Sequence, residues 1–301
     1  GDALTSGNSN VALGFNALTA DTLGDRAVAI GLNALASQNF TSSTDNYNVG
    51  VGYQAGYAVT TGSQNTMIGG LAGDATTTAD NITAVGYHAL SANTTGTQNV
   101  AVGSLTLDAN TTASNNTAVG HAALGANTTG AENTVVGALA GDALTTGFSN
   151  TALGMKALST DTTGRYSVAI GHSALENQAF TGNNNSYNTA VGYSAGNDVT
   201  TGVNNTLIGA LAGDAITTAN SNTAVGQAAL TASTTGANNV SIGYQSLYDN
   251  TTGGSNAAIG YRALANNTTA SNNTAVGTDA LFTNTTGYDN TAVGALSLDA
   301  N

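Results

Sequence analysis

One glycine-centred phrase recurs along the whole chain, and it constrains the fold more than any other feature. It reads NNTAVGHAALGANTTG from Asn115 to Gly130. With its glycine taken as position 0, fourteen of the sixteen spacings between successive copies are 17 residues and two are 21. A short period of this kind is typical of stacked structural units, each of which contacts only its neighbours.

The repeat itself has been duplicated. The two long spacings, 31–52 and 171–192, start 140 positions apart, and GDALTSG at Gly1 matches GDALTTG at Gly141. The sequence therefore predicts one repeat array over 1–301, in which an eight-coil unit occurs twice with this offset. The chain starts and ends within a coil and has no initiator methionine, so we expect a segment of a longer fibre.

Seventeen residues are too few for a helix-turn-helix unit but suit two short strands and two turns. The TAVG phrase is β-branched and ends in glycine, which is typical of a short strand, and the xALx phrase is predicted as a second strand. The NTTG cluster is typical of a turn. We predict an all-β, parallel β-solenoid (β-roll) of about 17 coils. The Asn found at position −4 in most coils either stacks into a ladder or only favours a turn.

Alternation along the strand predicts which side chains face inward. We place positions −3 and −1, which are β-branched or aliphatic, inside the coil, and positions −2 and 0, which are Ala and Gly, outside. A strand that is apolar on both faces is usually covered on both, so a second chain is predicted to cover the small residues. The alternative is that the glycine only forms a bend. Representative residues of this predicted intersubunit seam are Ala12, Gly14, Ala118, Gly120, Ala152, Gly154, Ala224 and Gly226.

Charge excludes several kinds of partner. Charged residues make up 7% of the chain, the net charge is −13, and only four residues are Lys or Arg. Binding to nucleic acid through phosphate neutralisation is therefore not expected, and neither is attraction to anionic lipid. No apolar run approaches the roughly 20 residues that span a bilayer, so no membrane insertion is expected in this segment.

Two phrases resemble a known family. RAVAIGLNALAS (Arg26–Ser37) and YSVAIGHSALEN (Tyr166–Asn177) resemble the head repeats of YadA-like trimeric autotransporter adhesins, and the NTAVGxxALxxNTTG form resembles β-solenoid shafts of phage tail-fibre-like proteins. The coils here are a few residues longer than is typical of that family. The resemblance implies a left-handed β-roll that forms a homotrimeric fibre. It also implies that the fibre lies outside the cell, on a cell surface or on a virion, and functions in cell adhesion or host recognition.

The sequence predicts no catalytic residues, no cofactor and no metal site, and hence no enzyme. His88 and His121 lie at different offsets from their glycines, and Glu132 and Glu176 do not form an acid pair. The Asp residues of the GDA phrases are predicted to be turn residues. Several Asn-Thr-Thr turns match the N-glycosylation acceptor, although Asn and Thr are also simply good turn formers: Asn93, Asn110, Asn127, Asn250, Asn267 and Asn284.

The two long coils carry the most distinctive surface feature. Each adds four residues to a turn and places Phe and Tyr in a polar loop, namely Phe40 and Tyr47 in one, and Phe180 and Tyr187 in the other. Aromatic residues in protruding loops bind partners such as sugars, so these four are candidate contacts for a cell-surface receptor or glycan. The alternative is that each loop folds back and buries its own Phe.

Three functions fit the repeat. The first is a structural or adhesive fibre segment. The second is a self-assembling filament or surface-layer subunit, because uncapped coil ends are strand edges that can pair. The third, which the sequence favours least, is an ice-binding solenoid. A flat ice-binding face needs Thr at i and i+2, whereas the Thr pairs here are adjacent and should point to opposite sides.

Overall fold

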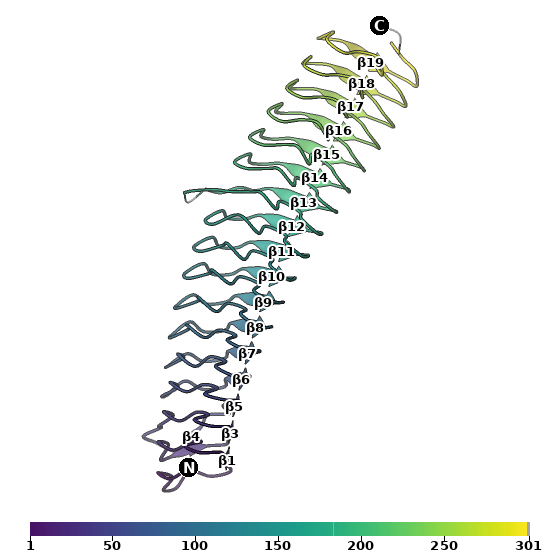
Figure 1. The fold of residues 1–301 in the computed structure, drawn as a ribbon. Helices are drawn as coiled ribbons and strands as arrows, with labels where there is room; N and C mark the ends of the chain where they lie inside the picture. Colours follow the sequence, from purple (N-terminus) through teal and green to yellow (C-terminus); the bar gives the residue numbers. More distant parts are fainter. Residues whose placement is uncertain (183, 300–301) are drawn as a thin grey trace. The chain divides into compact units, whose positions relative to one another are not determined.

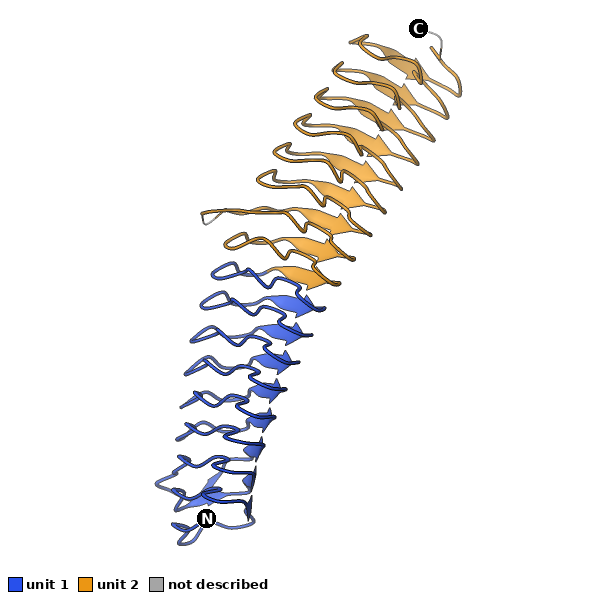
Figure 2. Cartoon of the chain, in the orientation of Figure 1, with its two compact units in different colours: residues 1–149 blue, residues 150–301 orange. Residues whose placement is uncertain are grey.

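A computed structural model describes residues 1–182 and 184–299. The described residues form an all-β, parallel β-solenoid of about 17 coils and contain no helix, which confirms the predicted fold class. The chain divides into two compact units, residues 1–149 and 150–301 (Figure 2), and Figure 1 labels the strands of both. In both units each coil contributes one three-residue strand.

Unit 1 contains one parallel ladder and one short additional pair. The ladder strands are β1 (Val11–Leu13), β3 (Val28–Ile30), β5 (Val49–Val51), β6 (Thr66–Ile68), β7 (Thr83–Val85), β8 (Val100–Val102), β9 (Thr117–Val119) and β10 (Thr134–Val136). The short strands β2 (Gly24–Asp25) and β4 (Thr44–Asp45) pair with each other in parallel.

Unit 2 repeats the ladder. Its strands are β11 (Thr151–Leu153), β12 (Val168–Ile170), β13 (Thr189–Val191), β14 (Thr206–Ile208), β15 (Thr223–Val225), β16 (Val240–Ile242), β17 (Ala257–Ile259), β18 (Thr274–Val276) and β19 (Thr291–Val293). Each strand pairs in parallel with the strand of the next coil.

The pairing register follows the repeat. Equivalent positions of successive coils face each other, as in Val100 against Thr117 across an ordinary spacing. The long coils keep this register, because Val28 pairs with Val49 and Val168 with Thr189 across the two long spacings. The four additional residues are therefore accommodated in the turn region and leave the sheet unchanged.

The prediction of which strand positions face inward is wrong. Position −2 is buried in its own coil in every ladder strand except β1, whereas positions −3 and −1 are half-buried or exposed. The larger residues found at −2, Met67, Val135 and Leu207, are also 0% exposed. The predicted interior column of Val, Ile and Leu at −1 thus lies on the outer face of the sheet.

The reason lies in how position −2 packs against position +4. Coils with Met67 or Leu207 at −2 have Gly73 or Gly213 at +4, where most coils have Leu. A Cβ on either glycine would lie 2.7 Å from the Met67 sulfur or from a Leu207 methyl carbon. The two positions therefore share one volume in the core, and a large side chain at one requires a small one at the other.

The predicted second strand is also wrong. The xALx phrase forms consecutive turns, with positive φ at +2 and +4, as in His88 (φ 53°) and Leu90 (φ 57°). Ala89 and Leu90 are both fully buried although they are adjacent. Adjacent residues of an extended strand point to opposite faces, so only a turn can direct both side chains into the core. The turns still bond from coil to coil, as where Leu90 N–H donates to the Thr106 carbonyl (2.9 Å).

The asparagine ladder is confirmed. Asn116 Oδ1 accepts the backbone N–H of Asn133 in the next coil (3.0 Å), and Asn116 Nδ2 donates to the Gly130 carbonyl (2.9 Å). A second column lies at position +7, where Asn110 Nδ2 donates to Asn93 Oδ1 (3.0 Å). Both columns are buried, so these amides satisfy backbone groups that water does not reach.

Replacement of a core leucine should destabilise unit 1 strongly. Leu124→Ala removes a side chain that is 0% exposed, and we expect it to lower the free energy of unfolding by about 2–5 kcal/mol. Thr129→Ala, on the exposed turn of the same coil, is the matched control and should change it by less than about 0.5 kcal/mol. Urea unfolding followed by circular dichroism measures both. Equal effects would contradict the assignment of the core.

Candidate binding surfaces

The alanines of the predicted seam do not form a surface. Ala118 and Ala224 are 0% exposed and Ala152 is 1% exposed within the single chain, because all three point into their own coil. Ala12 differs, since it lies in β1, the first strand, whose three residues are all exposed. The alanines at −2 are therefore core residues, and their assignment to an intersubunit contact is corrected.

The seam glycines have a role within the chain. Gly14, Gly120, Gly154 and Gly226 have φ between +134° and +138°, a region that side-chain-bearing residues rarely adopt. A Cβ on Gly120 would lie 2.6 Å from the carbonyl oxygen of Gly137 in the next coil, and the other three would meet the equivalent oxygen at 2.4–2.5 Å. The absent side chain thus allows close stacking of successive coils, and no partner chain is needed to explain it.

This requirement can be tested with two adjacent glycines. Gly69 has φ +134° and a Cβ there would lie 2.4 Å from the Gly86 carbonyl oxygen, whereas a Cβ on Gly70 meets nothing closer than 3.6 Å. We expect Gly69→Ala to destabilise unit 1 by about 2 kcal/mol or more, because it combines backbone strain with a steric clash. Gly70→Ala should be nearly neutral. Thermal unfolding of both variants is the measurement, and similar midpoints would refute the stacking explanation.

The outer face of the sheet is an uncharged surface. Its residues are Thr or Val at −3 in all coils except that of Ala257, and Val, Ile or Leu at −1, with no charged residue at either position. Several −1 side chains are more than a third exposed: Ile68, Leu153, Ile208, Ile242 and Ile259. We call the −3 and −1 residues of each unit its outer strand face. An uncharged and partly aliphatic face of this kind is typical of an interaction surface.

Exposed aromatic residues border the outer strand face at position +1. Tyr53, Tyr87 and Tyr193 are 50–58% exposed. Neighbouring coils stack such rings, as in Tyr244 on Tyr261, with centroids 5.4 Å apart and an interplanar angle of 13°. Tyrosine is enriched at protein interfaces, so this column extends the surface that a partner could contact.

The phenylalanines of the long coils are not surface contacts. Phe40 is 6% exposed and Phe180 is 3% exposed, so each loop folds back and buries its own Phe. The prediction that these two residues contact a partner is therefore wrong, and the alternative holds. The tyrosines differ, since Tyr47 and Tyr187 are 50% and 51% exposed.

Tyr47 and Tyr187 have different neighbours at equivalent places. In unit 1, the Arg26 guanidinium lies over the Tyr47 ring, 5.6 Å from its centroid, and forms an ion pair with Asp45. In unit 2, Tyr166 replaces the arginine and stacks on Tyr187 with centroids 5.3 Å apart and planes within 6°. The duplicated loops thus present an arginine over a tyrosine in one unit and two stacked tyrosines in the other, where Asn185 Nδ2 also donates to the Tyr187 hydroxyl (3.0 Å).

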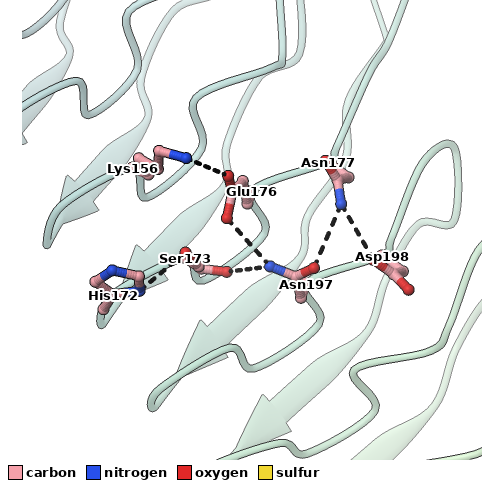
Figure 3. Close-up of polar contacts among 7 residues, drawn as sticks. All are labelled: Lys156, His172, Ser173, Glu176, Asn177, Asn197 and Asp198. Carbon is pink, nitrogen blue, oxygen red and sulfur yellow. Dashed lines mark hydrogen bonds and ion pairs between the residues drawn. The ribbon is translucent and has the colours of Figure 1, made fainter.

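Unit 2 also carries a polar patch that sequence analysis did not predict (Figure 3). Lys156 Nζ lies 3.3 Å from Glu176 Oε1, Asn197 Nδ2 donates to Glu176 Oε2 (3.4 Å), and Asn177 Nδ2 donates to Asp198 Oδ1 (3.1 Å). Hydrogen bonds from Ser173 and Lys156, together with the lysine charge, lower the pKa of Glu176. The residues 140 positions before Lys156, Glu176 and Asp198 are uncharged, namely Asn16, Ala36 and Ala58.

The asparagines of the candidate glycosylation motifs are inside the fold. Asn93, Asn110, Asn127, Asn250 and Asn267 are 0% exposed, and Asn284 is 3% exposed. Folded coils therefore do not present these amides to an enzyme, and the turn-forming interpretation holds. The adjacent threonines differ in their surroundings, because Thr94 is half-buried and donates its hydroxyl to the Thr111 carbonyl (3.1 Å), whereas Thr95 is exposed.

Several aspartates are partly withdrawn from water. Burial raises the pKa of Asp74, Asp108 and Asp214 above the ordinary value of 3.8. It also raises the pKa of Asp161, which is 0% exposed, and this effect exceeds the opposing hydrogen bonds from Gln178, Gly164 and Phe180. The folded chain consequently binds protons more readily at these sites than the unfolded chain does.

Mild acid should therefore stabilise the fold. Because their pKa values are raised in the folded state, the carboxyls of Asp74, Asp108 and Asp214 disfavour folding when they are ionised. This cost decreases as the pH falls through the raised pKa and is fully absent below 3.8. We expect a higher thermal midpoint near pH 4.5 than at pH 7. Repeating the comparison in 1 M salt screens the general repulsion of a chain with net charge −13, and the difference should persist. A lower midpoint at pH 4.5 would contradict the assignment.

Comparison with known proteins does not identify a family. No known protein family matches the chain, and no curated protein matches it. Within residues 1–182 and 184–299, no group of three or more His, Cys, Asp or Glu side chains could hold a metal ion, and no pocket forms. The described part of the chain also contains no helix long and apolar enough to cross a membrane.

Proposed function

We propose that the chain is a structural and adhesive segment of an extracellular fibre, assembled from three copies and presenting a receptor- or glycan-binding surface. The observation that supports this proposal is the outer strand face, which is uncharged in both units although the chain carries a net charge of −13. Copies with this charge repel each other over most of their surface. The outer strand face is where they can approach without that repulsion.

The area of this face suits self-association. Each coil contributes a strand about 10 Å long, and successive strands are about 4.8 Å apart. The eight ladder strands of unit 1 and the nine of unit 2 therefore each present about 400 Å². One partner of a standard protein interface buries about 800 Å², so each unit supplies about half of that area. A left-handed β-roll with three copies around one axis is what the resemblance to trimeric adhesins and tail fibres implies.

The adhesive part of the proposal is supported by the long coils and the polar patch. Tyr47 and Tyr187 are exposed on lengthened turns, and the Lys156–Glu176 group adds charged and amide side chains in unit 2. Exposed tyrosine and amide groups together are typical of surfaces that bind sugars and proteins through stacking and hydrogen bonds. The partner is thus proposed to be a cell-surface receptor or glycan.

Analytical ultracentrifugation with charged variants tests the assembly. We expect the native chain to sediment as a trimer, and Val225→Lys combined with Ile242→Lys to give a monomer, because two lysines per chain would be desolvated in the contact. Thr235→Lys, on the exposed turn of the same region, is the matched control and should leave the trimer intact.

A native chain with the mass of one copy would refute the trimer. A mass that grows with concentration would instead favour the alternative, a head-to-tail filament or surface-layer subunit. Binding of the intact trimer to a glycan array tests the adhesive role separately, and Tyr187→Ala should reduce any binding without changing the mass.

A further inference from the structure

The asparagine ladder is interrupted at both long coils. In the coils of Gly31 and Gly171, position −4 holds Ala27 and Ser167 in place of Asn. Their N–H groups still donate to the preceding Asn10 Oδ1 (2.8 Å) and Asn150 Oδ1 (2.9 Å). Neither residue has a carboxamide to continue the ladder. Ile82 interrupts it in the same way in the ordinary coil of Gly86, where the Ile82 N–H donates to Asn65 Oδ1 (3.0 Å). The two long coils differ from that coil in having a side-chain connection of another kind.

A buried carboxylate replaces asparagine in the second column, at position +7. At +7 of the coil before each long coil, Asp21 and Asp161 occupy the column that holds Asn in many ordinary coils, and both are 0% exposed. In unit 1, Asp21 Oδ1 accepts the N–H groups of Gly24 (3.1 Å) and Phe40 (3.2 Å). In unit 2, Asp161 Oδ1 accepts those of Gly164 (3.0 Å) and Phe180 (3.2 Å).

A glutamine connects the carboxylate to the next asparagine. Gln38 Nε2 donates to Asp21 Oδ2 (2.6 Å), and Gln38 Oε1 accepts from Asn48 Nδ2 (2.9 Å). Asn48 Oδ1 then accepts the N–H of Asn65 (3.0 Å), which resumes the ladder. Unit 2 has the same connections, Asp161–Gln178 at 2.7 Å, Gln178–Asn188 at 2.9 Å and Asn188–Asn205 at 2.9 Å. We call each set the Asp–Gln–Asn relay.

The direction of these hydrogen bonds requires an aspartate. The Oδ1 atom receives backbone N–H groups and Oδ2 receives the glutamine N–H, so both oxygens act as acceptors. An asparagine here would place its NH2 group against another donor. The threonine after the aspartate completes the attachment, since Thr22 Oγ1 donates to the Phe40 carbonyl (3.0 Å) and Thr162 Oγ1 to the Phe180 carbonyl (2.9 Å).

We infer that the Asp–Gln–Asn relay is the device that allows the solenoid to carry a long coil. It bridges the interruption in the asparagine ladder and holds the described part of the lengthened loop, with its exposed tyrosine, against the core. Two observations support this. The relay occurs at both long coils with the same atoms paired at nearly the same distances, and it joins each loop to the core through groups that are 0% exposed.

Hydrogen exchange measured by mass spectrometry tests the inference. Asp161→Asn combined with Gln178→Asn places in unit 2 the residue type that occupies this column in ordinary coils. This double variant removes the Asp161 carboxylate, which accepts hydrogen bonds at both oxygens. It also shortens the side chain at position 178, so that it no longer reaches Asn188. We expect the described loop residues after Gln178, 179–182 and 184–188, to exchange about tenfold faster. The Phe40–Asn48 loop, whose relay is intact in the same molecule, should be unchanged.

Two further variants make the result decisive. Asn267→Ala disturbs the same column in an ordinary coil and should accelerate exchange there without affecting either long loop. Gln178→Asn alone keeps the carboxylate and its backbone partners, so it folds more readily and should loosen the loop near Asn188. Loop exchange within twofold of the native rate in either Gln178 variant would overturn the inference. The inference would also be overturned if Asn267→Ala accelerated exchange in a long loop as much as the Gln178 variants do.

Discussion

The close approach of one glycine carbonyl to the glycine of the preceding coil is the constraint on which the rest of the structure depends. Because position 0 has a positive φ and no side chain, successive coils stack so closely that a Cβ would clash with the next backbone. That spacing lets the strands pair in register and lets the buried amides reach from coil to coil. The repeat is therefore held mainly by interactions between equivalent positions of neighbouring coils, as expected for a solenoid.

The core that results is unusually polar for its size. An ordinary coil buries two alanines and one leucine together with two asparagines, as in Ala118, Ala123, Leu124, Asn116 and Asn127. A buried amide is costly unless it is hydrogen-bonded, and here the amides bond both to each other and to backbone groups. The long coils follow the same rule with different residues, because an aspartate and a glutamine provide what an asparagine would otherwise supply.

The period predicted much of this fold, but not the orientation of its side chains. The repeat predicted the solenoid, a short strand in each coil and, as one of two alternatives, the asparagine ladder. The face assignment failed because hydrophobicity was taken as the guide, whereas Val119 lies outside and Ala118 inside. The sequence did contain a signal that position −2 faces the core, because the coils with Met67 and Leu207 at −2 have glycine at +4. The adjacent Ala123 and Leu124 likewise indicated a turn, because both are apolar.

The candidate contacts were predicted only in part. The sequence identified Tyr47 and Tyr187 as candidate surface residues of the long loops, but it could not show that Phe40 and Phe180 are buried. It also gave no sign of the polar patch at Lys156.

The register across the long coils has a consequence for how such a chain can change. Val28 and Val49 pair just as Val100 and Thr117 do, although four more residues separate them. Insertions confined to the turn that holds the four additional residues leave the spacing of successive coils unchanged. The outline of one coil can therefore vary while its neighbours keep their positions. Diversity in what the surface displays is thereby separated from the regularity that keeps the chain folded.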